Sequence, residues 1–358
     1  MLDPASSSSF ALGLRTGIRR RAQMFTPPSP RRWRRLAWRG AQGGILLLFG
    51  LSLFTLFLHN RMTPTRAAER PARIVGQGAA LHRINGFALW VLDAGPPSDP
   101  LPVIVLHGGP GQSSAPLREA FRFLESDHRV IYYDQRGAGR SEVKPELSHY
   151  TIDQLVHDLE ILRQAVVKQP RVRLLAHGFG GVLAQHYALS YPEHVESMIL
   201  LSSLPAEGAQ YSSVLEYYDD LLITLVRAGI PPADPVAADE WYARYWYRSA
   251  VAMLGDPSRS HKLPDLHGSF GAAQALNTSL AAAVRPQRMN HARLSSRTLL
   301  IYGQEESPCG EGEGIAPLLL RFNDATLATL PQTGYWSFLE EPGQVQSLIT
   351  AFFRYPSP

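Results

Sequence analysis

The sequence predicts an α/β fold in which a mostly parallel sheet carries helices on both faces and a helical lid is inserted late in the chain. Short apolar runs alternate with helical patterns, which is typical of parallel sheets with helical crossovers. The chain has 358 residues, of which 45% are hydrophobic and 18% charged, enough to bury a large core. An aromatic, proline-punctuated stretch interrupts the alternation before it resumes, and this stretch predicts the lid.

The basic character of the chain comes from arginines near its N-terminus. Lys occurs three times among 35 basic residues, and the formal net charge is +4. Residues 1–40 contain nine arginines and a single acidic residue, Asp3, so the excess positive charge is not a property of the predicted folded part. We therefore expect no nucleic-acid partner. The arginine-rich composition favours a GC-rich bacterial source.

The basic tail, residues 1–40, is followed by an uncharged run at residues 41–60. A bilayer core of about 30 Å needs about 20 helical residues, which this run supplies. We predict a single transmembrane anchor. Arginines are more frequent before the run than after it, which favours a cytoplasmic N-terminus and a periplasmic main domain at the bacterial inner membrane.

Two alternatives for the N-terminal segment stay open, a cleaved signal peptide and an organelle transit segment. The basic region is long for a signal peptide, and Met24 is an alternative start. Residues 61–78 contain two prolines and no periodicity, and they predict a tether. Cys309 is the single cysteine, so no intramolecular disulfide can form.

The folded part is predicted to begin near residue 79 with a β-hairpin. Residues 81–84 and 87–92 flank Asn85-Gly86, a pair that tolerates the positive φ angles of a tight hairpin turn. Four apolar runs then predict strands that are each followed by a helical pattern, at residues 103–106, 130–133, 172–176 and 198–201.

The clearest helix is predicted at residues 152–167, where an apolar stripe repeats every three or four residues and Thr151 with Gln154 forms a capping box. The aromatic region, residues 205–295, is predicted as the lid over the carboxyl ends of the strands, where open α/β sheets bind ligands. Strand patterns return at two places. The core is thus predicted from residues 79–204 and 296–358, with the last strands at 298–302 and 325–330.

Three ordered motifs carry a resemblance to a known family. One glycine-rich loop is His107-Gly108-Gly109-Pro110-Gly111, and another is Asp134-Gln135-Arg136-Gly137-Ala138-Gly139-Arg140-Ser141. Residues 172–181 then run as a buried strand, a sharp turn and a small-residue helix start, the context of a G-x-S-x-G nucleophile elbow. With these motifs the chain resembles the α/β-hydrolase superfamily, and within it the prolyl iminopeptidase-like peptidases, over roughly residues 80–358.

The resemblance also shows where this chain departs from the family's catalytic triad. The nucleophile position is Gly178, and no Ser, Thr or Cys lies between Thr151 and Ser190 to replace it. The acid position corresponds to Glu306. The histidine position corresponds to Tyr335, and the last His of the chain lies upstream of the acid.

These substitutions predict that the acyl-enzyme route is lost. Gly178 has no proton to give up, and a tyrosine with a pKa of about 10 is a poor general base near neutrality. Glycine also adopts positive φ without steric strain, which offers a reason why it was accepted at the elbow.

Other site residues follow from the resemblance or from position. The family's oxyanion hole corresponds to the backbone N–H groups of Gly109 and Phe179, which survive side-chain changes. The loop that begins at Asp134 is expected to be structural. His177 beside the elbow and Glu240 in the lid are candidate ligand-binding residues. No metal or cofactor is expected, because no zinc-ligand spacing, Walker A loop or dinucleotide fingerprint occurs.

We therefore predict a membrane-anchored pseudoenzyme that binds a small molecule, a peptide end or a protein partner. The first alternative is an active aminopeptidase-like or esterase-like hydrolase, or a lyase, with a non-standard mechanism that uses Glu306, Tyr335 or His177 and a bound water. The second is an envelope interaction protein that uses the lid surface. The sequence does not predict an oligomeric state.

Overall fold

The computed structural model describes residues 78–203, 231–263, 268–283, 293–306 and 316–354. The predicted basic tail and anchor lie outside these residues, as do Cys309 and all of the predicted tether except Gly78. Within the described ranges, no helix combines the length and the apolar character needed to cross a membrane.

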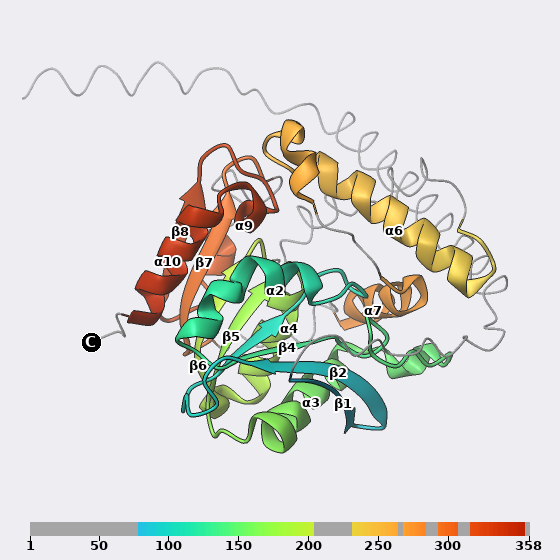
Figure 1. Cartoon of the computed structure of the whole chain (residues 1–358), viewed down its shortest axis with the longest axis horizontal. Helices are drawn as coiled ribbons and strands as arrows, with labels where there is room; N and C mark the ends of the chain where they lie inside the picture. The colour runs from blue at the N-terminus through green and yellow to red at the C-terminus, as the bar shows by residue number, and fades with distance from the viewer. Residues whose placement is uncertain (1–77, 204–230, 264–267, 284–292, 307–315, 355–358) are drawn as a thin grey trace, which may run out of the picture. The chain divides into compact units, whose positions relative to one another are not determined.

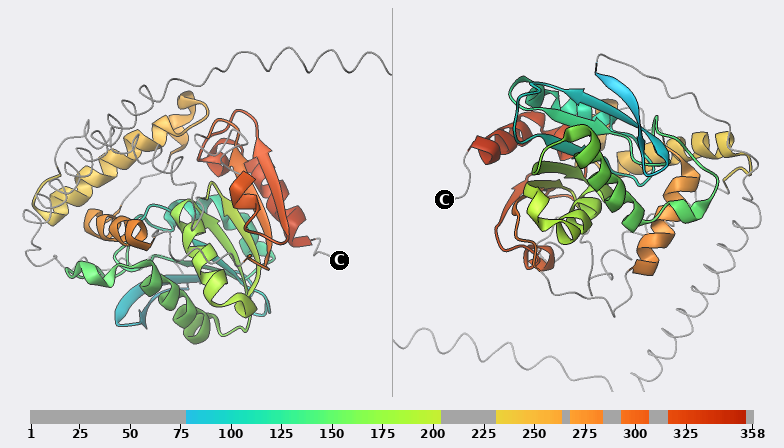
Figure 2. Two further views of the ribbon diagram at one scale, coloured as in Figure 1. Left: turned by 180° about the vertical axis from the view of Figure 1, so that it is seen from behind. Right: turned by 90° about the horizontal axis from the view of Figure 1, so that it is seen from below.

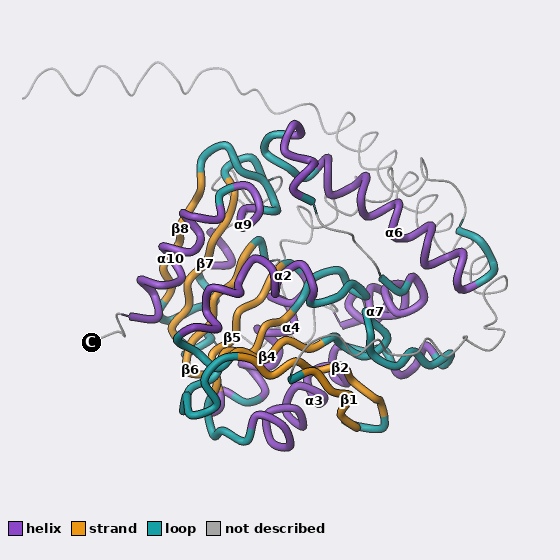
Figure 3. The backbone as a smooth tube through the Cα atoms, viewed as in Figure 1, coloured by secondary structure: helices purple, strands orange, loops and turns teal. Residues whose placement is uncertain are grey.

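The core is an eight-stranded sheet with strand order β1-β2-β4-β3-β5-β6-β7-β8. Strand β2 pairs antiparallel with β1 and β4, and every other neighbouring pair is parallel. Figures 1 and 3 show the strands of this sheet among the helices. The predicted mostly parallel sheet is confirmed. Its strands are β1 (Ala79–Ile84), β2 (Phe87–Ala94), β3 (Val103–Leu106), β4 (Val130–Tyr133), β5 (Val172–His177), β6 (Val195–Leu201), β7 (Arg297–Gly303) and β8 (Ala325–Leu330).

The hairpin between β1 and β2 turns at the predicted dipeptide. Asn85 has a φ of 47° and Gly86 a φ of 80°, and Ile84 pairs with Phe87 across the turn. Two successive positive φ angles define a turn whose twist matches that of the flanking strands.

Helices cover both faces of the sheet (Figure 2). Leu174 of β5 belongs to the core cluster that includes residues of α3 and α4. The guanidinium of its neighbour Arg173 lies 4.8 Å from the ring centroid of Phe353 in α10. Because successive side chains of a strand point to opposite faces, α10 covers the face opposite to α3 and α4. The helices of the core are α2 (Ala115–Phe121), α3 (Ile152–Leu162), α4 (Phe179–Ser190), α8 (Ala316–Leu319), α9 (Ser337–Glu340) and α10 (Pro342–Arg354), with short helices η1 (Arg122–Ser126), η2 (Leu147–His149), η3 (Arg163–Val167) and η4 (Pro192–His194).

The helix predicted at residues 152–167 forms with two differences. The α-helix ends at Leu162, and residues 163–167 continue as one π-helical segment. Thr151 Oγ1 accepts the predicted bond from the backbone N–H of Gln154, at 3.2 Å. The Gln154 side chain, however, accepts a bond from Asn85 Nδ2 at 3.0 Å, because the hairpin turn lies beside this helix end. The capping box is therefore only half formed.

Hydrogen bonds connect the lid to the core at two separate places. Its described helices are α6 (Pro235–Ala252), η5 (Pro257–Lys262) and α7 (Phe270–Ala283). Tyr242 Oη donates to the carbonyl of Pro110 at 2.8 Å, and the N–H of Ser269 donates to the carbonyl of Gly111 at 2.9 Å. At the other end, the N–H of Tyr335 donates to the carbonyl of Met253 at 2.9 Å. The lid thus rests on the loops that follow β3 and β8.

The carboxylate of Glu340 strengthens the second of these connections. It is buried and accepts bonds from the backbone N–H groups of Gly334 at 2.8 Å, Asp256 at 3.2 Å and Gly255 at 3.3 Å. One carboxylate therefore joins the loop after β8 to the end of the lid segment that contains α6.

Candidate functional site

The nucleophile elbow predicted from the sequence is formed between β5 and α4. Gly178 stands at the turn with φ 55° and ψ −119°. Its N–H donates to the carbonyl of Leu201 at 3.0 Å, and its carbonyl accepts from the N–H of Gly181 at 2.9 Å. Glycine takes this conformation without the strain that an L side chain would bring.

The start of α4 packs closely against the end of β3. A β-carbon on Gly180 would lie 2.8 Å from the carbonyl oxygen of His107 and would also collide with the carbonyl of Leu106. Only glycine allows this approach, which brings the elbow beside the glycine-rich loop that follows β3.

The phenol of Tyr335 fills the position that a nucleophile side chain would occupy. A β-carbon on Gly178 would overlap with Tyr335 Oη and would lie 2.9 Å from Tyr335 Cζ. A β-carbon on Gly108 would lie 3.6 Å from the same hydroxyl oxygen. Tyr335 therefore reaches the point where the elbow meets the loop after β3.

His177 is a buried neutral imidazole beside the elbow. Its Nε2 donates to the backbone carbonyl of Tyr335 at 3.2 Å, which assigns the ring hydrogen to Nε2. Its ring centroid lies 4.4 Å from that of Tyr335, 5.1 Å from Trp336 and 4.9 Å from Phe338. Burial lowers the pKa of His177 to about 4. The side chain packs among aromatic rings, and its ligand-binding role stays a prediction.

Glu306 contacts a serine that the sequence did not single out. Its Oε2 lies 2.8 Å from Ser202 Oγ and 3.4 Å from the N–H of Gly303. Ser202 Oγ also lies 2.9 Å from the carbonyl oxygen of Tyr335, the same carbonyl that accepts from His177. Burial raises the pKa of Glu306 to about 8, so it carries its proton near neutral pH.

The direction of the bonds follows from that proton. A hydroxyl has one hydrogen, and a carbonyl can only accept. Ser202 therefore donates to Tyr335, and the protonated carboxyl of Glu306 donates to Ser202. The sequence gives no signal for Ser202. Its contacts with Glu306 and Tyr335 arise because it directly follows β6 in the folded chain.

The predicted oxyanion donors lie beside the elbow. Phe179 is the first residue of α4, where backbone N–H groups have no partner within the helix. Gly109 has a φ of 119° in the loop that touches the elbow through Gly108. Glu240 is exposed on α6, two residues before the buried Tyr242 and therefore on another side of the helix. The roles of all three stay predictions.

A buried histidine supports the loop after β3. The N–H of Gln135 donates to His107 Nε2 at 2.9 Å, and His107 Nδ1 lies 2.9 Å from the carbonyl of Gly108. Because Nε2 accepts, Nδ1 carries the hydrogen and donates to Gly108. Burial lowers the pKa of His107, which keeps this neutral form.

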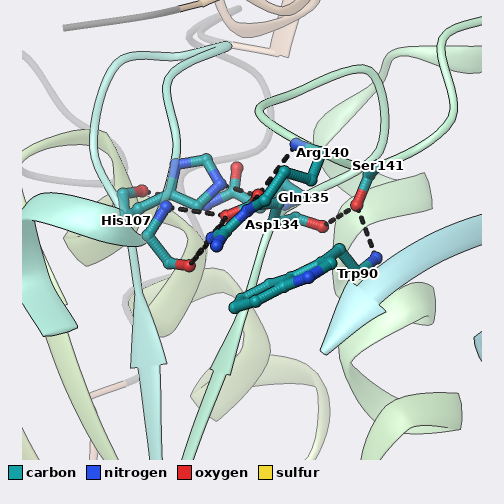
Figure 4. Close-up of polar contacts among 7 residues, drawn as sticks. Trp90, His107, Asp134, Gln135, Arg140 and Ser141 are labelled. Atoms are coloured by element: carbon teal, nitrogen blue, oxygen red, sulfur yellow. Dashed lines mark hydrogen bonds and ion pairs between the residues drawn. The ribbon is translucent and has the colours of Figure 1, made fainter. Parts of the chain in front are cut away.

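Asp134 organises the loop after β4 (Figure 4). Its carboxylate accepts from Ser114 Oγ at 2.7 Å and from Arg140 Nε at 2.7 Å. Burial acts to raise the pKa of Asp134, but its bonds and ion pair with Arg140 outweigh burial and hold the pKa below its usual value. Arg140 also stacks 3.1 Å from the ring centroid of Trp90. These contacts agree with the structural role expected for this loop.

No group of three or more His, Cys, Asp or Glu side chains in the described ranges is arranged to hold a metal ion.

Comparison with protein families decides where this fold belongs. The model of the α/β hydrolase fold matches residues 102–342, which is more than half of the chain. The chain belongs to this family. Within the family it is prolyl iminopeptidase-like, as the two glycine-rich loops suggest.

Curated relatives support the narrower assignment over part of the chain. A proline iminopeptidase of Saccharolobus solfataricus is 35% identical over 128 residues, which is 35% of this chain and 41% of that protein. A proline iminopeptidase of Pestalotiopsis fici is 38% identical over 133 residues, which is 35% of this chain and 46% of that protein. The matched segment thus spans less than half of each relative.

Solved structures share the fold. Epoxide hydrolase A of Mycobacterium thermoresistibile matches with a TM-score of 0.61 and 20% identity, over 78% of this chain and 98% of that one. A proline iminopeptidase-related protein of Thermus thermophilus matches with a TM-score of 0.54 and 23% identity, over 80% of this chain and 97% of that one. At these identities the likeness shows the fold alone.

Proposed function

We propose that this protein is a membrane-anchored α/β-hydrolase-fold pseudoenzyme that binds a ligand or partner without serine-hydrolase chemistry. The contact between Gly178 and Tyr335 carries the proposal, because a tyrosine hydroxyl occupies the place of the nucleophile side chain. A triad needs a hydroxyl or thiol at that place and a base to take its proton. Gly178 offers neither group.

The other two triad positions support the same conclusion. Tyr335 stands at the histidine position, and a phenol is a weak base near neutrality. Glu306 at the acid position carries a proton near pH 7 and is bonded to Ser202. A neutral carboxyl cannot stabilise an imidazolium as the acid of a triad does.

The bound species is proposed to be a small molecule or a peptide end held under the lid. Relatives named proline iminopeptidases match this chain over part of its length, and the lid helix α6 bonds to the loop after β3 through Tyr242. Backbone donors at Phe179 and Gly109 would keep their affinity for a carbonyl or carboxylate oxygen after catalysis is lost.

The enzymatic test uses the full chain purified in detergent. It is incubated with a fluorophosphonate probe and with a panel of prolyl and other aminoacyl arylamides and aryl esters, alongside an active prolyl iminopeptidase. We expect no labelling and no turnover above the buffer blank. Saturable turnover that co-purifies with the chain would contradict the proposal.

A hydrolase with a non-standard mechanism is the second candidate, because Glu306 has a pKa near 8, which suits general acid–base work near neutrality. The variant Glu306→Gln separates the two. Turnover by the parent chain that disappears in this variant would favour the hydrolase.

The anchor is proposed for residues 41–60, with the tail in the cytoplasm and the folded domain in the periplasm of a bacterial inner membrane. The uncharged run and the arginine bias before it support this placement. In spheroplasts, a C-terminal tag should be cleaved by added protease and the chain should stay with membranes after a carbonate wash. A protected tag, or a chain released by carbonate, would contradict the proposed topology.

A further inference from the structure

The lid helix α6 spans the two loops that meet at the elbow. Tyr242 bonds to Pro110 in the loop after β3, and Met253 directly after the helix accepts from Tyr335 in the loop after β8. These two residues are separated by about 16 Å along the helix axis. The side of α6 that carries Tyr242 therefore faces the loop after β3, and the C-terminal end of the helix meets the loop after β8.

Trp246 lies on the same side of α6, between the two anchoring residues. It follows Tyr242 by about one turn, and the two ring centroids are 6.1 Å apart. Trp246 is 5% exposed, and its indole Nε1 has no hydrogen-bond partner among the described residues. A buried donor without a partner is destabilising, and a bound molecule that accepts its hydrogen bond would remove that cost.

A second donor of this kind lies on the loop that Tyr242 contacts. Gln112 is 6% exposed, and in the part of the chain that the structure describes its Nε2 also has no hydrogen-bond partner. Its Cγ lies 3.3 Å from the position of a β-carbon on Gly109, so the side chain folds back along the loop that carries the predicted oxyanion donor. These two donors, one from the lid and one from the core, therefore lie on segments that are hydrogen-bonded to each other.

We propose that Trp246 Nε1 and Gln112 Nε2 bind the oxygen atoms of a small carboxylate ligand whose apolar body packs against the aromatic face of α6. The inference rests on the proposed function, since it requires a non-catalytic ligand site beneath the lid. Both side-chain groups are donors, and the backbone N–H of Phe179 adds a third at the N-terminus of α4, where negative charge is favoured.

The two titratable groups near Tyr335 do not repel a carboxylate. His177 and Glu306 are both neutral near pH 7, so neither repels an anion nor attracts a cation. The apolar part of the ligand would meet aromatic side chains that are buried along α6 on the side of Trp246, namely Tyr242, Tyr245 and Trp246 itself.

The test measures by calorimetry how three probes bind to the full chain in detergent. All three probes carry the same phenyl ring and differ in their polar end. Phenylacetate has two acceptor oxygens, phenylacetamide has one, and phenethylamine has none. We expect phenylacetate to bind best, phenylacetamide more weakly, and phenethylamine not at all. Phenethylamine binding as tight as that of phenylacetate, or no binding by any probe, would overturn the inference.

Two variants on separate elements locate the site. Trp246→Phe removes the indole N–H and keeps an aromatic ring, and Gln112→Met keeps the side-chain length and removes the donor. Each should weaken phenylacetate binding about tenfold. Trp241→Phe is the control, because it makes the same chemical change on the same helix. It should leave the affinity for phenylacetate within about twofold of the parent, a difference no larger than the error of the measurement. Equal losses in all three variants, or no loss in the first two, would contradict the assignment.

The two proposals fail in distinguishable ways. Fluorophosphonate labelling or turnover, together with phenylacetate binding that depends on Trp246 and Gln112, would refute the pseudoenzyme and keep the ligand site. An unlabelled, inactive chain that does not bind phenylacetate would keep the pseudoenzyme and refute the ligand site.

Discussion

The hydroxyl group of Tyr335 lies where the β-carbon of residue 178 would stand if that residue were not Gly178. The two departures from the family's catalytic pattern are therefore one structural arrangement. A tyrosine in this orientation requires glycine at the elbow, and glycine at the elbow leaves the volume that the phenol occupies.

Restoring the nucleophile alone should destabilise the protein. In Gly178→Ser the new β-carbon meets Tyr335 at a φ of 55°, so strain and collision act together. We expect the free energy of unfolding to fall by about 2–4 kcal/mol, measured by urea denaturation.

Gly86→Ser is the matched control for this variant. Gly86 has a φ of 80°, but apart from Gly86 and its two chain neighbours no atom of the described residues lies within 4 Å of the point where its β-carbon would stand, so only the conformational strain is added. Its loss should be about 1 kcal/mol. Equal losses in the two variants would show that Tyr335 does not obstruct residue 178.

Changing both positions should recover part of the loss. In the Tyr335→His background, Gly178→Ser should cost less than in the parent, with a coupling energy of about 1–3 kcal/mol in a double-mutant cycle. We expect the double variant to remain unlabelled by fluorophosphonate, because Glu306 is neutral and bonded to Ser202. Additive stability losses would contradict the coupling, and robust labelling would show that Glu306 can still orient an imidazole.

Glu306 should make stability fall as pH rises. Burial raises its pKa to about 8 in the folded chain, whereas the unfolded group titrates near its usual value of about 4.3. Between these values the folded state holds a proton that the unfolded state has released, so the free energy of unfolding decreases with increasing pH.

Glu306→Gln lacks this proton and imitates the neutral carboxyl. The variant should gain stability over the parent from about pH 5 to about pH 8, by an amount on the order of a few kcal/mol. Urea denaturation of both proteins at several pH values gives the difference between their free energies of unfolding. His177 and the other titratable groups are the same in both proteins, so their contributions cancel in this difference. Parallel pH profiles for the two proteins would argue against a raised pKa.

Loss of the Glu340 carboxylate should loosen the lid. Glu340→Gln weakens bonds to three backbone N–H groups and should lower stability by about 2 kcal/mol, with faster hydrogen exchange at residues 253–258 and 333–336. Glu341→Gln is the control, because Glu341 pairs with Arg259 nearer the surface and should contribute less than about 1 kcal/mol. Exchange that rises equally in both variants would refute a special role for Glu340.

Much of the fold was predictable because its signals are local. The apolar runs that became β3, β4 and β8 have the predicted limits, and Asn85-Gly86 turns as its backbone preferences require. The end of the α-helix at Leu162 was missed, because the apolar stripe continues through the π-helical segment that follows.

Site positions could be predicted only where a local pattern or the family resemblance assigns them. The strand-to-helix turn predicted the elbow at Gly178, and the resemblance assigned Glu306 and Tyr335, whose catalytic positions stay predictions. The bond from Ser202 to Tyr335 and the collision between Tyr335 and residue 178 join segments far apart in the chain, so neither has a local signal.

Asp134 and His107 stabilise the glycine-rich loops through bonds within the protein, not through contact with a reacting group. Mutational drift after loss of turnover would still be constrained at these residues, since a chain without them would fold less well. Both loop sequences can therefore be kept for folding alone, whether or not a chain has catalytic activity. When peptidase activity is inferred from sequence, the residues at positions 178 and 335 are therefore more informative together than either glycine-rich loop.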